Sequence, residues 1–463
     1  MNETTRDIKG PVTADTLPDI EVVRDLVAQR RWSEARELLQ DAPAPDIADF
    51  LIEVDDHDRV LLFRLLPRPV ASEVFSYLEP QKKDDLLSNL SDKEAGRLLA
   101  GLSPDDRTDF FEELPGQATQ RLLNLLSPED RREALQLLGY PEESVGRLMT
   151  PDYVAVRPDW TVGQAIEHIR RRGRDSETIN VIYVVDRSWK LLDALELRRF
   201  ILAQSDVNVE AIMDYAFVSI SANEDREKAV DLIQRYDLDA LPVVDSEGVL
   251  IGIVTVDDVM DVAQEEVTED FHRVAGVIPL KSSYREVGLW SLFIKRIGWL
   301  TGLILVNIAA AEIIASHEEL LLSSIALAFF IPLLIATGGN TGAQSATMVI
   351  RAIATGDLRP DDWFWAAARE LLLGTILGLT LGVLVWILGY HRGGWGFGLV
   401  VFLSMAGIVL VSNLIGTGLP FLLHKLRVDP AVASSPLITS VADVAGLAIY
   451  FSIAAWVLGI FNG

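Results

Sequence analysis

The chain has 463 residues and no cysteine, which excludes a disulfide framework, a thiol nucleophile and a cysteine-based zinc site. Its formal net charge is −26 at pH 7, and of its 67 acidic and 41 basic side chains only ten and nine lie after Tyr284. The part before Tyr284 is therefore so acidic that it repels nucleic acid and attracts cations, and we expect no nucleic-acid partner. The length calls for two to four domains, and residues 1–20 lack the apolar run of a cleaved signal peptide.

A repeat with a period of twelve occupies the first part of the chain. Between Val54 and Leu138 a residue of one register, almost always leucine, recurs at this interval, and an apolar pair stands eight and nine positions after each. Serines and prolines, which start helices, directly follow many of these positions. The pattern predicts one short helix and one turn per repeat, stacked as a right-handed solenoid or compact superhelix. We expect an N-terminal tail and first helix over 1–40 and a helical-repeat cytosolic domain over 41–140.

Two copies of one α/β unit follow, at 144–203 and 207–263. The second copy predicts an amphipathic helix, a strand at 240–245, a turn, a strand at 249–255 and a closing helix from Val256. This order resembles the tandem CBS pair, a small module found in regulated channels and enzymes. The expected boundaries are 141–204 for CBS 1 and 205–262 for CBS 2.

CBS modules can take adenine nucleotides in a cleft. Thr255 and Asp258 match the Thr/Ser-x-x-Asp pattern that contacts ribose in such modules, which makes ATP a candidate ligand of the second copy. The first copy reads Leu192-Asp-Ala-Leu-Glu-Leu at this place and lacks the glycine and the threonine. The sequence therefore argues for a nucleotide in one cleft and against it in the other.

The segment after the second copy is a predicted acidic helix. Helical spacing places Asp258, Asp261, Glu265 and Glu269 along one face, with Glu266 and Asp270 beside them. Like charges three and four residues apart repel, and hardly any basic residue is interleaved. Carboxylate oxygens at this density suit Mg2+ or Ca2+, and the alternative is a solvated acidic surface. We expect a connecting helix over 263–284.

The remainder of the chain, 285–463, is a predicted transmembrane domain. Its uncharged apolar runs are nearly all long enough to cross a bilayer, and the short first one extends back to Phe293 if Lys295 and Arg296 reach the interface. The predicted spans are about 293–315, 320–350, 364–390, 393–423 and 431–460. Eight of the nine basic residues become cytosolic if the N-terminus is inside, and only Arg392 falls outside. This count predicts a multi-pass protein of the cell (inner) membrane with a cytoplasmic N-terminus and an outer C-terminus.

Asp443 lies in the middle of the fifth predicted span. Thr439 stands one turn before it on the same helix face, and Gly446 stands about one turn after it. A carboxylate at this depth costs several kcal/mol, so it marks an ion or substrate path unless it merely bonds a neighbouring helix.

Two glycine patterns accompany it. The stretch Thr337-Gly-Gly-Asn-Thr-Gly-Ala-Gln344 either loosens its helix, turning carbonyl groups toward a watery cavity, or allows close helix packing. Gly374, Gly378 and Gly382 recur every four residues, which is typical of a packing face.

The order of helical repeat, CBS pair, acidic helix and five spans resembles the MgtE family of magnesium channels over essentially the whole chain. The most specific matches are Gly338-Gly-Asn-Thr-Gly-Ala-Gln344, Asp443-Val-Ala-Gly446 and Thr255-Val-Asp-Asp-Val-Met-Asp261. The expected fold is multi-domain, with an α-helical repeat domain, tandem CBS α/β modules, a connecting plug helix and a five-helix transmembrane domain.

The resemblance implies a homodimer in the lipid bilayer, with a pore on its two-fold axis lined by the second and fifth spans. Asp443 of each protomer would hold a hydrated Mg2+. The implied pore-lining residues beside it are Gly338, Gly339, Asn340, Thr439 and Gly446.

The resemblance also implies cytosolic Mg2+ sites that close the pore when Mg2+ is abundant. By motif position the implied sensor carboxylates are Asp225, Glu227, Asp237, Asp258, Asp261, Glu266, Glu269 and Asp270. Further candidates lie in the helical domain, where the repeats make the alignment ambiguous: Glu73, Asp105 and Asp109.

Other function classes have less support. An intramembrane metalloprotease needs two histidines and an acid on one helix, and the six histidines are scattered. The chain also lacks a P-loop, so we expect neither an enzyme nor an ATP-driven pump. A secondary transporter or exchanger for Mg2+ or another divalent ion such as Co2+ stays open beside the channel.

Overall fold

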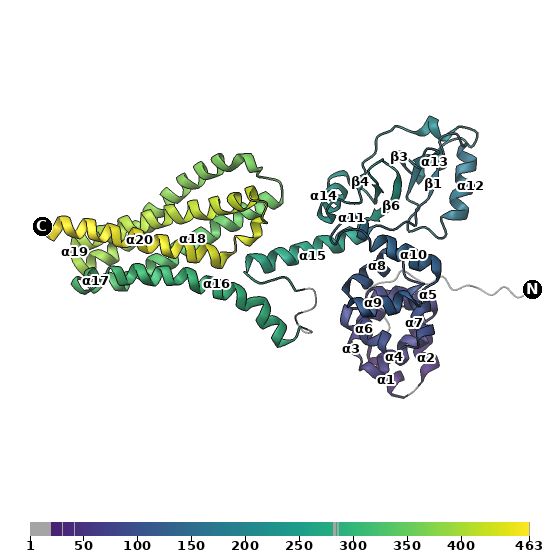
Figure 1. Cartoon of the computed structure of the whole chain (residues 1–463), viewed down its shortest axis with the longest axis horizontal. Coiled ribbons are helices and arrows are strands. Elements are labelled where there is room, and N and C mark those ends of the chain that lie inside the picture. The colour runs from purple at the N-terminus through teal and green to yellow at the C-terminus, as the bar shows by residue number, and fades with distance from the viewer. Residues whose placement is uncertain (1–19, 30, 41, 281–283, 285–286, 463) are drawn as a thin grey trace, which may run out of the picture. The chain divides into compact units, whose positions relative to one another are not determined.

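The structure is a computed structural model that describes residues 20–29, 31–40, 42–280, 284 and 287–462 (Figure 1). It divides into two compact units, Met1–Gln264 and Glu265–Gly463, called here the N-terminal unit and the membrane unit. Residues 1–19 of the predicted tail and residues 281–283 of the predicted connecting helix lie outside the described residues.

The N-terminal unit begins with short helices in series. From α3 to α10 they start at residues 44, 56, 68, 80, 92, 104, 116 and 128, which confirms the period of the repeat. Their bounds are α1 Ile20–Ala28, α2 Trp32–Gln40, α3 Ala44–Glu53, α4 Asp56–Leu65, α5 Arg68–Ser76, α6 Pro80–Ser88, α7 Asp92–Leu99, α8 Pro104–Glu113, α9 Gly116–Leu123 and α10 Pro128–Leu137.

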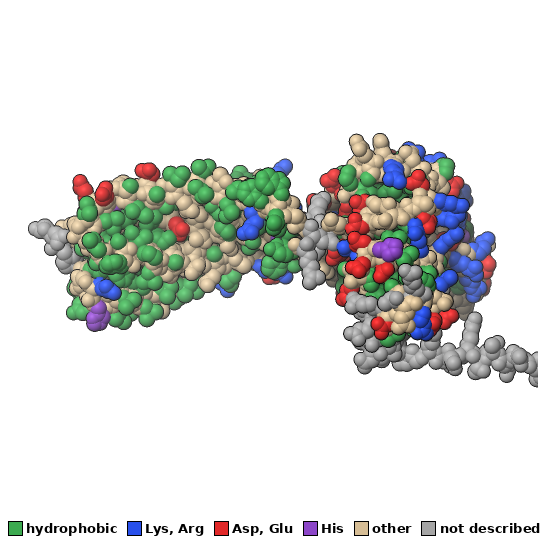
Figure 2. Space-filling model, turned by 90° about the horizontal axis from the view of Figure 1, so that it is seen from below, with side chains coloured by type: hydrophobic (Ala, Val, Ile, Leu, Met, Phe, Trp, Pro, Cys, Tyr) green, Lys and Arg blue, Asp and Glu red, His purple; other side chains and the backbone are tan. Residues whose placement is uncertain are grey.

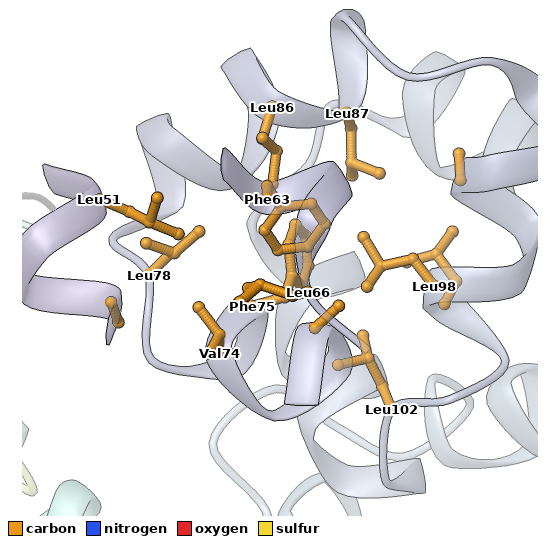
Figure 3. Packing of buried hydrophobic residues seen from close by; sticks show 14 of the residues in the cluster. Leu51, Phe63, Leu66, Val74, Phe75, Leu78, Leu86, Leu87, Leu98 and Leu102 are labelled. Atoms are coloured by element: carbon orange, nitrogen blue, oxygen red, sulfur yellow. The ribbon is translucent and has the colours of Figure 1, made fainter. Parts of the chain in front are cut away.

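The apolar pairs of the repeat form the common core of these helices (Figure 3). The rings of Phe63 and Phe75 meet edge to face with centroids 6.4 Å apart, and those of Phe75 and Phe110 meet in the same way at 5.4 Å. Each repeat therefore buries its apolar pair against neighbouring repeats, and no single helix has a core of its own.

The two CBS modules have matching sheets. In each, the first strand pairs in parallel with the second, the second pairs antiparallel with the third, and the register shifts near the end of the second strand. The first module contains α11 Val145–Leu148, β1 Ala155–Val156, α12 Val162–Arg172, β2 Val181–Val185, β3 Leu191–Glu196 and α13 Leu197–Leu202. The second contains the 3-10 helix Val209–Ile212, β4 Ile220–Ser221, α14 Arg226–Tyr236, β5 Ala240–Val244 and β6 Leu250–Thr255.

The modules are joined by backbone contacts as well as by packing. Thr150 exchanges two hydrogen bonds of 2.9 Å with Ile253, and the hydroxyl of Tyr153 donates to the carbonyl of Leu250 at 2.9 Å. Side chains from both sheets share one apolar cluster that includes Tyr183 and Leu250. The pair therefore folds as one body.

The expected connecting helix over 263–284 is not separate from the closing helix predicted from Val256, and it ends earlier than expected. Helix α15 runs without interruption from Val256 to Val274, so it starts directly after β6. Gly276 ends it with a φ of 72°, where its N–H donates to the carbonyl of Arg273 and the N–H of Val277 donates to that of His272. This pair of bonds is the Schellman ending, which a glycine after the helix favours.

The membrane unit consists of long apolar helices, and the face in Figure 2 is accordingly dominated by hydrophobic side chains. Its elements are α16 Leu289–Ser316, α17 Glu318–Ser323, α18 Ala326–Ala354, the 3-10 helix Pro360–Asp362, α19 Trp363–Lys425, the 3-10 helix Pro430–Val432 and α20 Ser435–Asn462. Within the described residues, four helices are long and apolar enough to cross a membrane, and α19 is one of them.

Helix α19 accounts for two of the five predicted spans. Gly394 has non-helical angles, φ 77° and ψ −167°, which separate a first arm (363–393) from a second arm (395–425). A Cβ on Gly378 would lie 2.8 Å from the carbonyl oxygen of Ala406, and one on Gly382 would lie 3.0 Å from the ring of Phe402. From Gly378 to Gly382 the contacts advance along the first arm, while their partners go back along the second arm from Ala406 to Phe402, so the two arms are antiparallel. These close approaches confirm the predicted glycine packing face.

Of the two alternatives for the stretch 337–344, the structure shows close helix packing and not a loosened helix. Helix α18 continues through it, and its glycines instead allow close packing against α19 and α20. A Cβ on Gly342 would lie 2.9 Å from the carbonyl oxygen of Ser412, and a Cβ on Gly416 would collide with the carbonyl of Gly342. Small residues let the two backbones approach where larger side chains would hold them apart.

Candidate functional site

Asp443 is the only charged residue of α20 and lies where α20 packs against α18. A Cβ added to Gly339 of α18 would stand 2.7 Å from the methyl group of Thr439 and 3.5 Å from Oδ1 of Asp443. That Oδ1 is buried and has no hydrogen-bond partner among the described residues. The hydroxyl of Thr439 does not supply one, because it donates to the carbonyl of Ser435 at 2.8 Å. A buried carboxylate oxygen without a donor needs a partner such as a water or a cation.

The other predicted pore residues divide into two kinds. A Cβ on Gly338 would collide with the side chain of Ile408, and one on Gly446 would stand 3.0 Å from Ile335. These two glycines therefore lie at helix contacts within the chain. Asn340 is exposed on the surface of α18. Within one chain, the structure thus brings Gly339 and Thr439 next to Asp443.

A second group of carboxylates lies in the N-terminal unit, where α8 approaches the start of α15. Asp105 is only 7% exposed, and its Oδ1 has no hydrogen-bond partner among the residues described. Burial, with a smaller contribution from the charge of Asp106, raises the pKa of Asp105 to about 6. Burial, reinforced by the charges of Asp105 and Asp257, raises the pKa of Asp258 to about 8.

Four more acidic residues belong to this group. Burial raises the pKa of Glu177, with help from Asp105 and Asp257, to about 7. Burial also raises the pKa of Asp261, to which the charges of Asp257 and Asp109 contribute. Burial raises the pKa of Tyr77, and the charges of Glu73, Asp257 and Asp261 contribute to the shift. Glu73 therefore adjoins the same surface. We call this set the carboxylate cluster: Glu73, Asp105, Asp106, Asp109, Glu177, Asp257, Asp258 and Asp261.

The chemistry of the carboxylate cluster suits a hard cation, but its geometry is open. Raised pKa values mean that the negative forms repel one another and lose hydration, and a divalent cation would relieve both effects. Within the described part of the chain, however, no three side chains of His, Asp or Glu stand close enough to hold one ion directly. Magnesium that keeps several of its waters needs few direct ligands, so the cluster fits a hydrated ion.

Three predicted sensor residues lie elsewhere, at the two ends of α14. Asp225 is the N-cap of this helix and accepts a hydrogen bond of 2.9 Å from the N–H of Glu227. Asp237 caps the other end with a φ of 51°. A helix of 11 residues is about 16 Å long, so Asp225 and Asp237 of one chain cannot share an ion.

The last part of α15 belongs to the membrane unit and forms a separate charge group there. Arg273 pairs with Glu269 on its own helix and with Asp429, which directly precedes the 3-10 helix before α20. Burial raises the pKa of Asp270, and the charge of Asp429 contributes to the shift. Glu266 also lies on this part of α15. We call this set the α15 charge group: Glu269, Asp270, Arg273 and Asp429.

The predicted ribose contacts of the second CBS module are hydrogen-bonded to each other. The hydroxyl of Thr255 donates to Oδ2 of Asp258 at 2.6 Å, at the junction of β6 and α15. In the first module the corresponding strand, β3, ends at Glu196, and the residue three places later is Arg199, which pairs with Asp214 at 2.6 Å. The predicted difference between the two copies is therefore present in the structure.

Sequence reasoning missed several members of these groups. Asp106 and Asp257 directly precede or follow predicted residues, and their adjacency was the available sign. Arg273 was noticeable as a rare basic residue in an acidic helix, whereas nothing in the spacing ties it to Asp429, far along the chain. Glu177 lies in a turn before β2, and only the tertiary fold brings it to the cluster.

Comparison with known protein families matches separate segments of the chain to separate domains. Residues 331–453 match MgtE, described as a divalent cation transporter, and residues 42–143 match the MgtE intracellular N domain. Residues 145–206 and 209–265 each match the CBS domain.

Comparison with individual proteins extends over most of the chain. The magnesium transporter MgtE of Thermus thermophilus is 41% identical over 426 residues, 91% of this chain and 95% of that protein. The magnesium transporter MgtE of Bacillus subtilis is 33% identical over 90% of this chain and 95% of that protein. A crystal structure of the cytosolic domain of the Mg2+ channel MgtE in complex with ATP has a TM-score of 0.51 and 37% identity, covering 52% of this chain and 99% of that domain. The chain therefore belongs to the MgtE family of magnesium transporters.

Proposed function

We propose that this protein is a homodimeric, Mg2+-selective channel that imports magnesium through a pore beside Asp443. The observation that carries the proposal is the buried, unpartnered carboxylate oxygen of Asp443 at the contact of α18 and α20. Two such carboxylates across a two-fold axis attract a divalent ion more strongly than a monovalent one. Because Mg2+ loses water reluctantly, they recognise it through its inner water shell.

The carboxylate cluster and the α15 charge group are proposed as the cytosolic Mg2+ sensor. Without Mg2+ the carboxylates repel one another; with Mg2+ between them the repulsion is removed and the closed state is favoured. The buried, unpartnered Oδ1 of Asp105 and the raised pKa of Asp258 support this role. Asp225, Glu227, Asp237 and Glu266 are included on the family resemblance, and Asp225 and Asp237 of one chain would belong to different ions because they lie at opposite ends of α14.

Two further parts of the proposal rest on the sequence and the relatives. The distribution of basic residues supports an N-terminus in the cytoplasm and a C-terminus outside. ATP is proposed to bind the second CBS module, because a relative's cytosolic domain was crystallised with ATP and the pair Thr255 and Asp258 is present here. Asp258 would then serve both a nucleotide and the carboxylate cluster.

Single-channel recording tests the proposal directly. Purified protein in a planar bilayer with a Mg2+ gradient is expected to give unitary currents carried by Mg2+, which disappear as cytosolic Mg2+ rises. A secondary transporter or exchanger would instead give flux that depends on a counter-ion and shows no unitary events. Replacing Mg2+ with Co2+ in the same bilayer compares the currents that the two transported ions carry.

A further inference from the structure

A second polar group lies inside the membrane unit, between α18 and both arms of α19. Oε2 of Glu370, on the first arm, receives hydrogen bonds from Oγ of Ser345 and from Nδ2 of Asn413, both at 3.2 Å. The hydroxyls of Ser345 and Thr417 lie 2.9 Å apart, and the hydroxyl of Thr417 donates to the carbonyl of Asn413 at 2.9 Å, which lies 3.3 Å from the Ser345 hydroxyl oxygen. We call these four residues the Glu370 site. Ser345 is about 9 Å further along α18 than Gly339, so this site is separate from the position of Asp443.

The Glu370 site has one more acceptor than its donors can satisfy. Asn413 is 1% exposed, and its Oδ1 has no hydrogen-bond partner within the described residues. Turning the amide group by half a turn does not cure this, because Oδ1 would then face the carboxylate of Glu370, and neither oxygen has a proton to give. In both orientations an oxygen at the centre of a helix bundle lacks a positive partner, which is costly in an apolar surrounding.

No basic side chain neutralises Glu370. In the described part of the chain it forms no ion pair, and its neighbour Arg369 instead lies over the ring of Trp365, 5.3 Å from its centroid. The positive charge of Arg351, on α18, instead acts to lower the pKa of Asp270, against the larger effect of burial. Helices α18, α19 and α20 carry few other ionisable side chains. On α19 these are Tyr390, His391, Arg392, His424 and Lys425, and on α20 they are Asp443 and Tyr450.

We propose that the Glu370 site binds one monovalent cation, Na+ or a proton, between the carboxylate of Glu370 and the amide oxygen of Asn413, with the amide turned so that its oxygen takes the place of Nδ2 beside Glu370. One carboxylate balances one positive charge, and the other oxygens, from Ser345 and Thr417, are neutral. Magnesium is disfavoured because it requires near-octahedral geometry and keeps several waters, whereas Asn413 and Thr417 are each only 1% exposed. Gly374 keeps the site open, since a Cβ there would stand 3.2 Å from Nδ2 of Asn413.

The test is thermal unfolding of the full-length protein in detergent, with Na+ exchanged for choline at constant ionic strength and with pH varied from 5.5 to 8.5. The comparison is between the wild type and Glu370→Gln, with Asp361→Asn as the control because Asp361 is an exposed carboxylate of the same unit. A cation that binds only the folded state shifts the folding equilibrium about 11-fold at ten times its dissociation constant.

The two cations give different outcomes. If the ligand is Na+, the wild type gains stability with Na+, and Glu370→Gln loses this gain at every pH. If it is a proton, Na+ has no effect, and Glu370→Gln removes a rise in stability at low pH because glutamine mimics the protonated acid. The proposal fails if the variant loses the same stability under all conditions, which is the behaviour of a helix-to-helix hydrogen bond, or responds to both cations as the wild type does. If Glu370→Gln does not fold, Thr417→Val, which keeps the side-chain shape, replaces it. This variant is expected to change several-fold the cation concentration at which half of the gain in stability is reached.

Discussion

Asp443 and the carboxylate cluster hold their carboxylates in opposite ways. In the membrane unit, Asp443 is the one charged residue of α20, and no donor among the described residues reaches its buried Oδ1. In the N-terminal unit, Asp105 and Asp258 stand among many other carboxylates, and burial together with mutual repulsion raises their pKa values. A solitary carboxylate discriminates between ions by charge, whereas a crowded one makes the stability of an arrangement depend on how many cations are present.

The proposed functions follow from this contrast. Losing the solitary carboxylate removes the only charge at its site, so the effect on transport should be large and independent of Mg2+ concentration. Losing one crowded carboxylate leaves several others, so the effect should be smaller and confined to the Mg2+ concentration at which the protein responds.

Asp443→Asn is expected to reduce Mg2+ flux into proteoliposomes by about 100-fold or more, equivalent to roughly 2.8 kcal/mol. The reason is that an amide of the same shape cannot supply the negative charge that attracts a divalent ion. Asp361→Asn, in an exposed position of the same unit, is the control and should transport normally. Flux near the wild-type value in a folded Asp443→Asn protein would remove Asp443 from the pore.

The double variant Asp105→Asn with Asp258→Asn is expected to raise the Mg2+ concentration that halves channel opening by about tenfold, which corresponds to roughly 1.4 kcal/mol of lost coupling. Both the repulsion that opposes closure and the ligands that favour it are weakened, and at high Mg2+ the loss of ligands should dominate because repulsion is screened. Patch recordings across a cytosolic Mg2+ series measure this, and the conductance of single openings should not change.

Two controls accompany this variant. Asp84→Asn removes an exposed carboxylate from the same helical domain and should leave the midpoint unchanged. Glu269→Gln with Asp270→Asn alters the α15 charge group instead, and a shift there but not in the first double variant would assign sensing to the membrane unit. An unchanged midpoint in both would mean that these acidic groups are only solvated surface.

The Mg2+ response of the N-terminal unit should also depend on pH. The pKa of Asp258 is raised to about 8, that of Glu177 to about 7 and that of Asp105 to about 6, so protons compete with Mg2+ below pH 8. For a carboxyl whose folded-state pKa is raised, the folded state binds more protons than the unfolded state. Its contribution to stability is then fully present below the unfolded pKa, near 4, and is lost as pH rises through the folded pKa.

Raising the pH from 6 to 8 is therefore expected to destabilise the Mg2+-free unit and to lower, several-fold, the Mg2+ concentration that restores it. Limited proteolysis of the full-length protein, with Na+ at matched ionic strength as the reference, measures the protection. The pH dependence should shrink in Asp258→Asn. Equal cleavage in Mg2+ and Na+ at pH 8 would contradict divalent binding by the cluster.

Sequence patterns predicted the parts of this molecule that periodicity controls. The regularly spaced apolar pairs gave the starts of α3 to α10, and the repeated strand and helix motifs gave both CBS sheets. The long apolar helices of the membrane unit were also predictable, because apolar length is what a bilayer requires. The end of α15 was missed, although Gly276 supplied a recognisable helix stop.

The parts that could not be predicted depend on contacts between distant segments. The glycines of 337–344 fit either a loosened or a tightly packed helix, and only the proximity of Ser412 and Gly416 decides for packing. Glu370 was passed over because its partners, Ser345 and Asn413, lie on other segments and share no motif with it. A pattern within one helix indicates its exposed and buried faces, but it does not identify which residue of another helix packs against the buried face.

The smallest expected effect concerns Asp225, which the family resemblance assigns to the sensor and the structure places as the N-cap of α14. The two roles can be separated because asparagine caps a helix about as well as aspartate but carries no charge. Asp225→Ala should cost about 1 kcal/mol of stability through the lost cap, whereas Asp225→Asn should cost almost none. Since Asp237 is about 16 Å away at the other end of α14, we expect Asp225→Asn to shift the inhibitory Mg2+ midpoint by no more than about twofold. Thermal unfolding and patch recordings on the same two variants measure both effects. A tenfold shift with unchanged stability in Asp225→Asn would show instead that Asp225 holds an ion as strongly as the crowded carboxylates do.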